Sequence, residues 1–91
     1  MRRYKLYVPI EAESFTAGVL LTFTKGFTRY RADGFWSDSN RKWIREGIVV
    51  FEILGEHDTG ELHTLAEKIK ERFRQDSVLF TVEEGVQATF V

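Results

Sequence analysis

The first apolar pattern in the chain alternates with a period of two. Over residues 3–10, one side of the alternation consists of Tyr4, Leu6, Val8 and Ile10. The other side carries Arg3, Lys5 and Tyr7. A period of two is typical of a strand that is buried on one face only. Pro9 has no backbone N–H to donate, so it marks the end of this strand or an edge position.

Two later segments have the period of a helix. Between residues 11 and 24, Phe15, Val19 and Phe23 recur at every fourth position, although Gly18 and several threonines weaken the pattern. The second segment lies within residues 56–75, and its apolar stripe consists of Leu62, Leu65, Ala66, Ile69 and Phe73. Asp58 and Glu61 precede this stripe with the spacing of a capping box. We therefore predict a helix in each segment.

A β-hairpin is predicted between the two helices. Residues 27–32 form its first arm and residues 43–54 its second arm. We expect the turn in residues 33–42, where Asp33-Gly34 is a dipeptide typical of tight hairpins. The second arm contains Ile48-Val49-Val50-Phe51, which is apolar on both faces of a strand. Such a strand is normally central in its sheet and covered on both sides.

The order of the elements predicts the fold class. Residues 77–82 and 85–91 read as two further strands, separated by Glu83-Glu84-Gly85. The resulting order is β-α-β-β-α-β with a C-terminal strand extension. This is the ferredoxin-like α+β pattern, an antiparallel sheet with two helices on one face. We expect residues 1–91 to form one such domain, with the first and third strands as its central pair.

The predicted sheet has a second face that no helix covers. It would expose Val49, Phe51 and Ile53, or the alternate residues of the same strand. A contiguous apolar patch of this kind usually marks an association surface. We therefore predict a homodimer in which the two sheet faces pack together.

Composition limits the classes of protein and the location. The chain is 43% hydrophobic and 30% charged, which is typical of globular proteins, and it has no cysteine for disulfides or thiolate metal sites. Its first residues lack the apolar core of a signal peptide, and no apolar run approaches the ~20 residues of a membrane span. We expect a cytoplasmic protein without a membrane partner.

Charge is distributed unevenly although the formal net charge is −1. The cations of residues 25–46 are Lys25, Arg29, Arg31, Arg41, Lys42 and Arg45, against only three acidic residues. The base-stacking, phosphate-binding face of a nucleic-acid module has a similar pattern, formed here by Arg29, Arg31, Arg41, Lys42 and Arg45 with Tyr30, Trp36 and Trp43 between them. Because the net charge is negative and the aromatic-glycine signature of such modules is absent from the third strand, nucleic acid is an alternative and not the expected partner.

Six residues of this region form the candidate ligand-binding site: Tyr7, Thr28, Tyr30, Trp36, Arg45 and Glu46. Arg45 and Glu46 are neighbours on a strand, so their side chains point to opposite faces. Glu46 shares its face with apolar residues, where it would act as an acid or base, or it forms a cross-strand ion pair with Arg29 or Arg31. Trp36 and Trp43 either stack on a planar ligand or fill the end of the core.

The two histidines do not form a metal site. His57 and His63 lack the spacing of a ligand pair, and no dense cluster of metal-ligating residues accompanies them. The chain also contains no glycine-rich phosphate loop and no nucleophile elbow. We assign no catalytic residue, no metal and no cofactor.

Two blocks of sequence resemble a known family. Gly26-Phe27-Thr28, Gly34-Phe35-Trp36 and Arg45-Glu46 form the first block, and Phe73-x-Gln75-x-Ser77-Val78-Leu79 forms the second. They are similar to the Gly-[Leu/Phe]-Thr, Gly-x-Trp, Arg-Glu and Phe-x-Gln-x-Ser-Val-Leu pattern of a domain of unknown function found in small bacterial proteins, many of them predicted lipoproteins. The resemblance implies a ferredoxin-like fold and no mechanism. We expect no envelope location, because the family's export and lipid-attachment region is not seen here.

Three functional hypotheses remain. The preferred hypothesis is a small dimeric α+β protein that acts by binding a small-molecule or anionic ligand, or a partner. The second is an enzyme of the dimeric α/β-barrel type that uses one Glu or Tyr as acid or base. The third is a nucleic-acid-binding module that uses the basic and aromatic hairpin.

Overall fold

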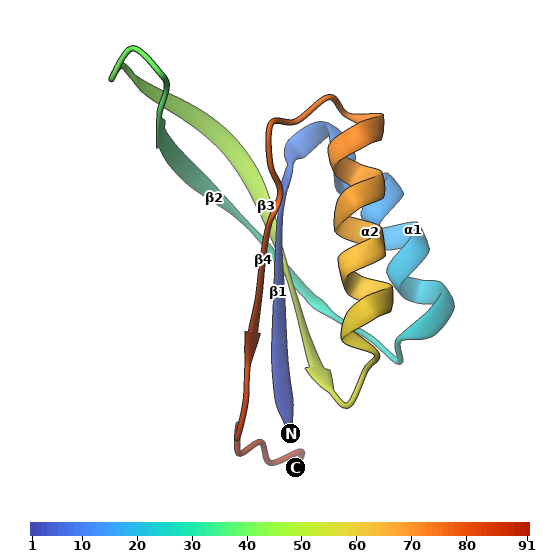
Figure 1. The fold of residues 1–91 in the computed structure, drawn as a ribbon. Helices are drawn as coiled ribbons and strands as arrows, with labels where there is room; N and C mark the ends of the chain where they lie inside the picture. Colours follow the sequence, from blue (N-terminus) through green and yellow to red (C-terminus); the bar gives the residue numbers. More distant parts are fainter.

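The computed structural model describes residues 1–91 as a four-stranded sheet with two helices on one face (Figure 1). The elements in chain order are β1 (Arg2–Pro9), a 3₁₀ turn (Ile10–Ala12), α1 (Glu13–Phe23), β2 (Thr28–Ser37), β3 (Trp43–Gly55), α2 (Thr59–Arg72) and β4 (Leu79–Glu83). The strands lie in the order β2-β3-β1-β4, and every neighbouring pair is antiparallel. The predicted ferredoxin-like α+β class is confirmed.

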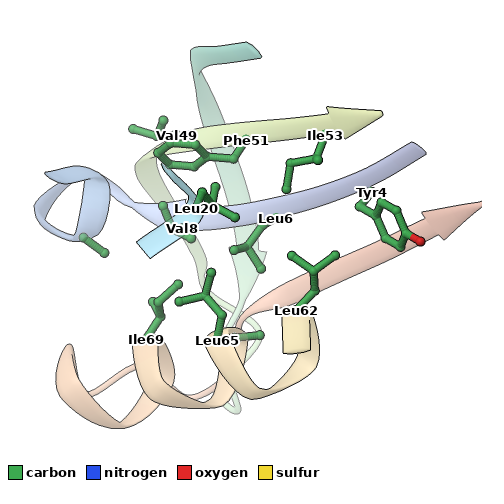
Figure 2. Close-up of a cluster of buried hydrophobic side chains, with 12 residues drawn as sticks. Tyr4, Leu6, Val8, Leu20, Val49, Phe51, Ile53, Leu62, Leu65 and Ile69 are labelled. Carbon is green, nitrogen blue, oxygen red and sulfur yellow. The ribbon is translucent and has the colours of Figure 1, made fainter. Parts of the chain in front are cut away.

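The core lies between the central strand pair and the helices. Tyr4, Leu6 and Val8 of β1 lie opposite Ile53, Phe51 and Val49 of β3, respectively. All six side chains are buried and form one cluster with residues of both helices, among them Leu20, Leu62, Leu65 and Ile69 (Figure 2). The helix-facing set of β3 is therefore Val49, Phe51 and Ile53, and the alternate residues lie on the other face.

Helix α2 begins where the capping signal predicts. The side chain of Asp58 accepts a hydrogen bond of 2.8 Å from the backbone N–H of Gly60. This bond satisfies one of the N–H groups that have no partner within the first turn of a helix. Neither α1 nor α2 is long and apolar enough to cross a membrane.

The turn lies inside the predicted residues 33–42, but its expected start at Asp33-Gly34 is wrong, because β2 continues through both residues to Ser37. The turn lies at residues 38–42, where the Asp38 carboxylate accepts hydrogen bonds from the backbone N–H groups of Asn40 and Lys42. Arg41 adopts a left-handed φ of 62°, which is typical of three-residue hairpin loops. The later turn is favoured because it satisfies these N–H groups and extends the strand pairing.

The longer hairpin projects beyond the rest of the sheet (Figure 1). Pairing of β1 with β3 ends at Pro9 and Ile48, so residues 43–47 of β3 pair only with residues 33–37 of β2. We call this two-stranded part, with its turn, the ribbon (residues 33–47). Its large exposed side chains lie on both faces, with Phe35 and Trp43 on one face and Trp36 and Ile44 on the other.

The predicted C-terminal strand is absent from the structure. Residues 84–91 form no strand, and their one backbone hydrogen bond runs from the N–H of Val86 to the carbonyl of Met1. Gly85 has a φ of 68° and turns the chain away from the end of β4. After this turn the segment makes no further backbone hydrogen bond, although Phe90 lines the cavity at the start of β2 together with Thr28 and Leu54. Phe90 is left 78% exposed.

Candidate functional site

The helix-free face of the sheet carries the candidate site. Since side chains alternate between the two faces of a strand, this face holds the residues between those of the core. Its large or aliphatic members are Tyr7, Tyr30, Ala32, Trp36, Ile44, Ile48, Val50, Leu54 and Leu79. The third-strand residues on this face are thus Ile48 and Val50, which are the alternates of the predicted set. Both are nearly buried by their neighbours, whereas Tyr30, Trp36, Ile44 and Leu79 remain exposed.

A cleft of about 550 Å³ opens on this face where the ribbon leaves the sheet. The end of β1 contributes Tyr7 and Pro9, and the ribbon contributes Trp36, Ile44 and Glu46. Residues 75–79, which lead from α2 into β4, form the opposite wall. The cleft therefore lies in the fork between the ribbon and the start of β4, in line with β1 beyond Pro9.

Gly34 positions the indole of Trp36 in this cleft. The two residues share the helix-free face, and a Cβ added to Gly34 would lie 3.1 Å from the indole ring. This is closer than ordinary van der Waals contact, so a side chain at residue 34 would displace the ring. The Gly-x-Trp motif of the first block thus has a local physical reason. The missing side chain lets the indole lie along the strand.

The walls of the cleft contain carboxylates and no basic side chain. The acidic residues are Asp38, Glu46 and Asp76, and no Lys or Arg lines the cavity. Asp38 already accepts two hydrogen bonds within the hairpin turn. An anion would find no cation here, whereas a neutral or positively charged group would meet favourable electrostatics. The geometry supports an apolar, planar or extended ligand without negative charge.

Arg45 lies on the opposite face from Glu46, as the alternation predicts. Its guanidinium pairs with the carboxylate of Asp33 at 3.0 Å. The predicted ion pair between Glu46 and Arg29 or Arg31 is wrong. Both arginines are on the helix side of β2, where the carboxylate of Glu13 on α1 lies 3.7 Å from Arg29 and 3.5 Å from Arg31.

The six predicted site residues are therefore only partly brought together. Tyr7, Trp36 and Glu46 line the cleft. Tyr30 lies on the same face, opposite Val50 and outside the cleft lining. Thr28 lines a different cavity, of about 750 Å³, at the far end of β2.

Sequence reasoning missed the apolar walls and the segment that closes the cleft. Ile44 and Ile48 share the face of Glu46, so the alternation of β3 contains the signal for them. Gln75, Ser77 and Leu79 belong to the second block of the family resemblance, and all three line the cleft. The two blocks are far apart in the chain and meet at this cavity. Only the folded sheet reveals that they are neighbours.

The histidines lie away from the cleft. The ring of His57 packs edge-on against Tyr4, with 5.8 Å between the ring centroids. His63 is exposed on α2, and its Nδ1 lies 3.5 Å from a carboxylate oxygen of Glu67. His57 is therefore a packing residue, and His63 is a solvent-exposed residue of the helix.

Comparison with known protein families identifies one match. The family model described as "Protein of unknown function (DUF3574)" matches residues 11–90. No curated protein sequence matches the chain.

Several solved structures share the fold. A phage SAM lyase in complex with S-methyl-5'-thioadenosine aligns with a TM-score of 0.70 at 16% identity, over 91% of this chain and 80% of the lyase. The PII-like protein CutA from Nostoc sp. PCC 7120, in apo form, aligns with a TM-score of 0.68 at 18% identity, over 93% and 81% of the two chains. CutA from Pyrococcus horikoshii, solved in 3 M guanidine hydrochloride, gives 0.62 at 16% identity, over 96% and 88%. These likenesses show the fold alone.

Proposed function

The chain belongs to the DUF3574 family of proteins of unknown function, and from the geometry of its cleft we propose that it acts by binding, as a homodimer joined through the helix-free face. In this proposal the site is the cleft between the ribbon and the start of β4. Its occupant is an apolar group without negative charge, held between Trp36 and the aliphatic walls. The observation that carries the proposal is an apolar cleft, with carboxylates and no cation, on a face that no helix covers.

Association through this face is supported by its exposed side chains. Tyr30 and Trp36 are 42% and 43% exposed, and Ile44 and Leu79 are 48% and 46% exposed. They lie on the same face of the sheet, on β2, β4 and the ribbon. Covering them removes apolar surface from water, which is the main favourable term in protein association.

The homodimer is tested by the molar mass of two matched variants. Tyr30→Asp places a charge on the helix-free face, and Leu21→Asp places one on the outer side of α1, where Leu21 is 64% exposed. We expect Tyr30→Asp to shift the protein toward the monomer and Leu21→Asp to leave it unchanged. Equal masses for the two variants and the wild type, with both variants folded, would contradict association through this face.

The cleft is tested with a pair of fluorescent probes of similar shape. N-phenylnaphthylamine is uncharged, and anilinonaphthalene sulfonate carries a negative charge. At a protein concentration low enough to keep the chain monomeric, we expect the uncharged probe to bind more tightly. We expect Trp36→Ala to weaken its binding more than Trp43→Ala does, because Trp43 does not line the cleft. Tighter binding of the sulfonate, or equal loss in both variants, would contradict the proposed site.

An enzyme is the second candidate function, because Tyr7 and Glu46 line the same apolar cleft. A hydroxyl and a carboxylate in such surroundings are suited to acid–base chemistry. S-methyl-5'-thioadenosine, the ligand in the phage lyase structure, is uncharged and aromatic, so it is a suitable first small molecule to test. Binding that depends on Trp36, followed by turnover that Glu46→Gln abolishes, would favour the enzyme over the binding protein.

Nucleic-acid binding is not favoured by the surroundings of the cations. Arg29, Arg31 and Arg45 pair with carboxylates of the same chain. Only Arg41 and Lys42, at the turn of the ribbon, have no ion pair among the cations predicted for such a surface. Two cations offer few phosphate contacts.

A further inference from the structure

Two features of the fold have no strand partner within the chain. The first is an open strand edge. Residues 43–47 of β3 pair with β2 on one side, and β1 has already ended on the other side. Alternate backbone N–H and C=O groups along this edge therefore face the cleft without a strand to pair with.

The second feature is a strand-like segment that is not a strand. Residues 86–91 read Val-Gln-Ala-Thr-Phe-Val, with no charged side chain and with β-branched and aromatic residues that favour strands. The structure leaves them without regular pairing and leaves Phe90 and Val91 exposed. A sequence with high strand preference and exposed apolar side chains is suited to adding to an open edge.

The two features match in length, polarity and side-chain pattern. The open edge has five residues, which residues 87–91 of the segment can pair with. The cleft beside the edge is apolar and contains no cation, so it suits an uncharged segment. If residues 87–91 continue the line of β1, Ala88 lies opposite Glu46 and Phe90 lies opposite Ile44. Val86 stays outside the added strand, because Ile48 already pairs with Pro9. Phe90 then lies beside Ile44 on the face that also carries Trp36, with Ile44 between the two aromatic residues.

The segment cannot reach the cleft of its own chain. It starts at Val86, which is bonded to Met1 at the opposite end of β1 (Figure 1). The eight residues of β1 span roughly 26 Å, at about 3.3 Å per residue. Six fully extended residues reach at most about 22 Å. An occupant from this sequence must therefore come from a second copy.

We propose that residues 87–91 of one copy add as a strand to the open edge at residues 43–47 of a second copy, and fill its cleft with Phe90. The proposal rests on the proposed function, because it names the partner that the cleft binds. A two-fold exchange, in which each copy gives its segment to the other, makes the assembly closed. The turn at Gly85 directs the segment away from its own β4, as such an exchange requires.

The absence of cysteine allows a direct test by cross-linking. Ala88→Cys is mixed with an equal amount of Glu46→Cys made with a different tag, and the mixture is equilibrated in a glutathione redox buffer. Residues that face each other across antiparallel strands have Cβ atoms about 4.5–5.5 Å apart, close to the separation a disulfide needs. The control mixes Ala88→Cys with Leu21→Cys. We expect the mixed disulfide with Glu46→Cys to form in clear excess over the control, and equal yields would overturn the proposal.

A pair of full-chain variants provides the second readout. Phe90→Asp places a charge in the inserted segment, and Leu21→Asp is the exposed control. We expect Phe90→Asp to raise the dissociation constant of the dimer about tenfold, equivalent to about 1.4 kcal/mol, and Leu21→Asp to leave it unchanged. An unchanged constant for a folded Phe90→Asp variant would contradict the insertion.

The outcomes separate this proposal from the proposed function. If Tyr30→Asp dissociates the dimer but Ala88→Cys and Glu46→Cys give no excess of mixed disulfide, association through the face is supported and the exchanged strand is overturned. If Phe90→Asp dissociates the dimer but Tyr30→Asp leaves it intact, the exchanged strand is supported and association through the face is contradicted. If residues 86–91 leave the cleft open to another occupant, such as a small molecule or a different protein, the disulfide yield equals the control and the proposal is overturned.

Discussion

The hydroxyl of Tyr4 links the first strand to the chain that follows β3. The Tyr4 side chain is fully buried, and its hydroxyl donates to the carbonyl of His57 at 2.9 Å and accepts from the His57 N–H at 3.2 Å. These two bonds satisfy backbone groups of residue 57 that secondary structure leaves unpaired. A buried polar group that loses its partner costs about 1–3 kcal/mol.

Replacing Tyr4 with phenylalanine therefore has a defined expected cost. Tyr4→Phe keeps the ring and removes both hydrogen bonds, so we expect the free energy of unfolding to fall by about 1–3 kcal/mol. The matched control is Tyr7→Phe, because Tyr7 lies on the other face and its hydroxyl makes no hydrogen bond within the chain. Urea unfolding of both variants measures the difference in the free energy of unfolding, provided that the slope of this free energy against urea concentration is unchanged. Equal midpoints for the two variants would contradict the role of the hydroxyl.

A second prediction concerns the contact between Gly34 and Trp36. Gly34→Val places a side chain where the indole lies, although valine suits a strand better than glycine does. In a Trp43→Phe background, we expect tryptophan emission to shift to longer wavelength without loss of stability. Binding of the uncharged probe should weaken about tenfold, since an aromatic contact is worth about 0.5–1.5 kcal/mol. Gly18→Ala is the control, because nothing lies within 4 Å of a Cβ there. Unchanged emission in Gly34→Val would contradict the contact.

The sequence identified individual site residues only in part. The alternation of side chains along β3 correctly predicted that Arg45 and Glu46 lie on opposite faces of the sheet. This rule does not depend on which strands or helices lie next to β3. It did not predict that Arg29 and Arg31 pair with Glu13, since that contact depends on where α1 crosses the sheet. The grouping of Trp36 with Leu79 likewise depends on packing between segments that are distant in the chain.

Helix α2 shows how far local signals determine an element. Its apolar stripe and its cap were both predicted from spacing, and Asp58 does cap the helix. Replacing Asp58 with alanine removes the hydrogen bond to Gly60, and we expect a loss of about 1 kcal/mol in the free energy of unfolding. Asp58→Asn keeps an acceptor at the same place and should remain close to the wild type.

Thermal and urea unfolding of the two Asp58 variants check this prediction. The expected order of stability is wild type, then Asp58→Asn at nearly the same value, then Asp58→Ala clearly lower. If Asp58→Asn were as unstable as Asp58→Ala, the loss would arise from the charge near the helix N-terminus and not from the hydrogen bond.

The hairpin and the C-terminal segment show where local signals fail. Asp33-Gly34 has the sequence of a tight turn, yet the turn at Asp38 satisfies two backbone N–H groups and adds strand pairs beyond residue 34. Residues 86–91 have the pattern of a strand, yet a strand forms only beside another strand. In both cases pairing between segments outweighs the preference of a few residues, and such pairing is not visible in a local window.

Across the full chain, the architecture was predictable because many weak signals agree. The order of strands and helices, the doubly apolar third strand and the stripe of α2 all point to one sheet with helices on one face. The location of the cleft was not predictable, because it depends on the point where the ribbon leaves the sheet. The same point leaves an edge of β3 open, so the fold and the candidate site have a common origin.

The central claim is that a second copy covers the helix-free face. Sedimentation equilibrium of the wild-type chain over a range of concentrations tests this claim most directly. We predict a species with twice the 10.6 kDa mass of the chain, which Tyr30→Asp shifts toward the single chain. A mass of one chain at every concentration would contradict the claim, and a mass of three chains would contradict the two-fold arrangement.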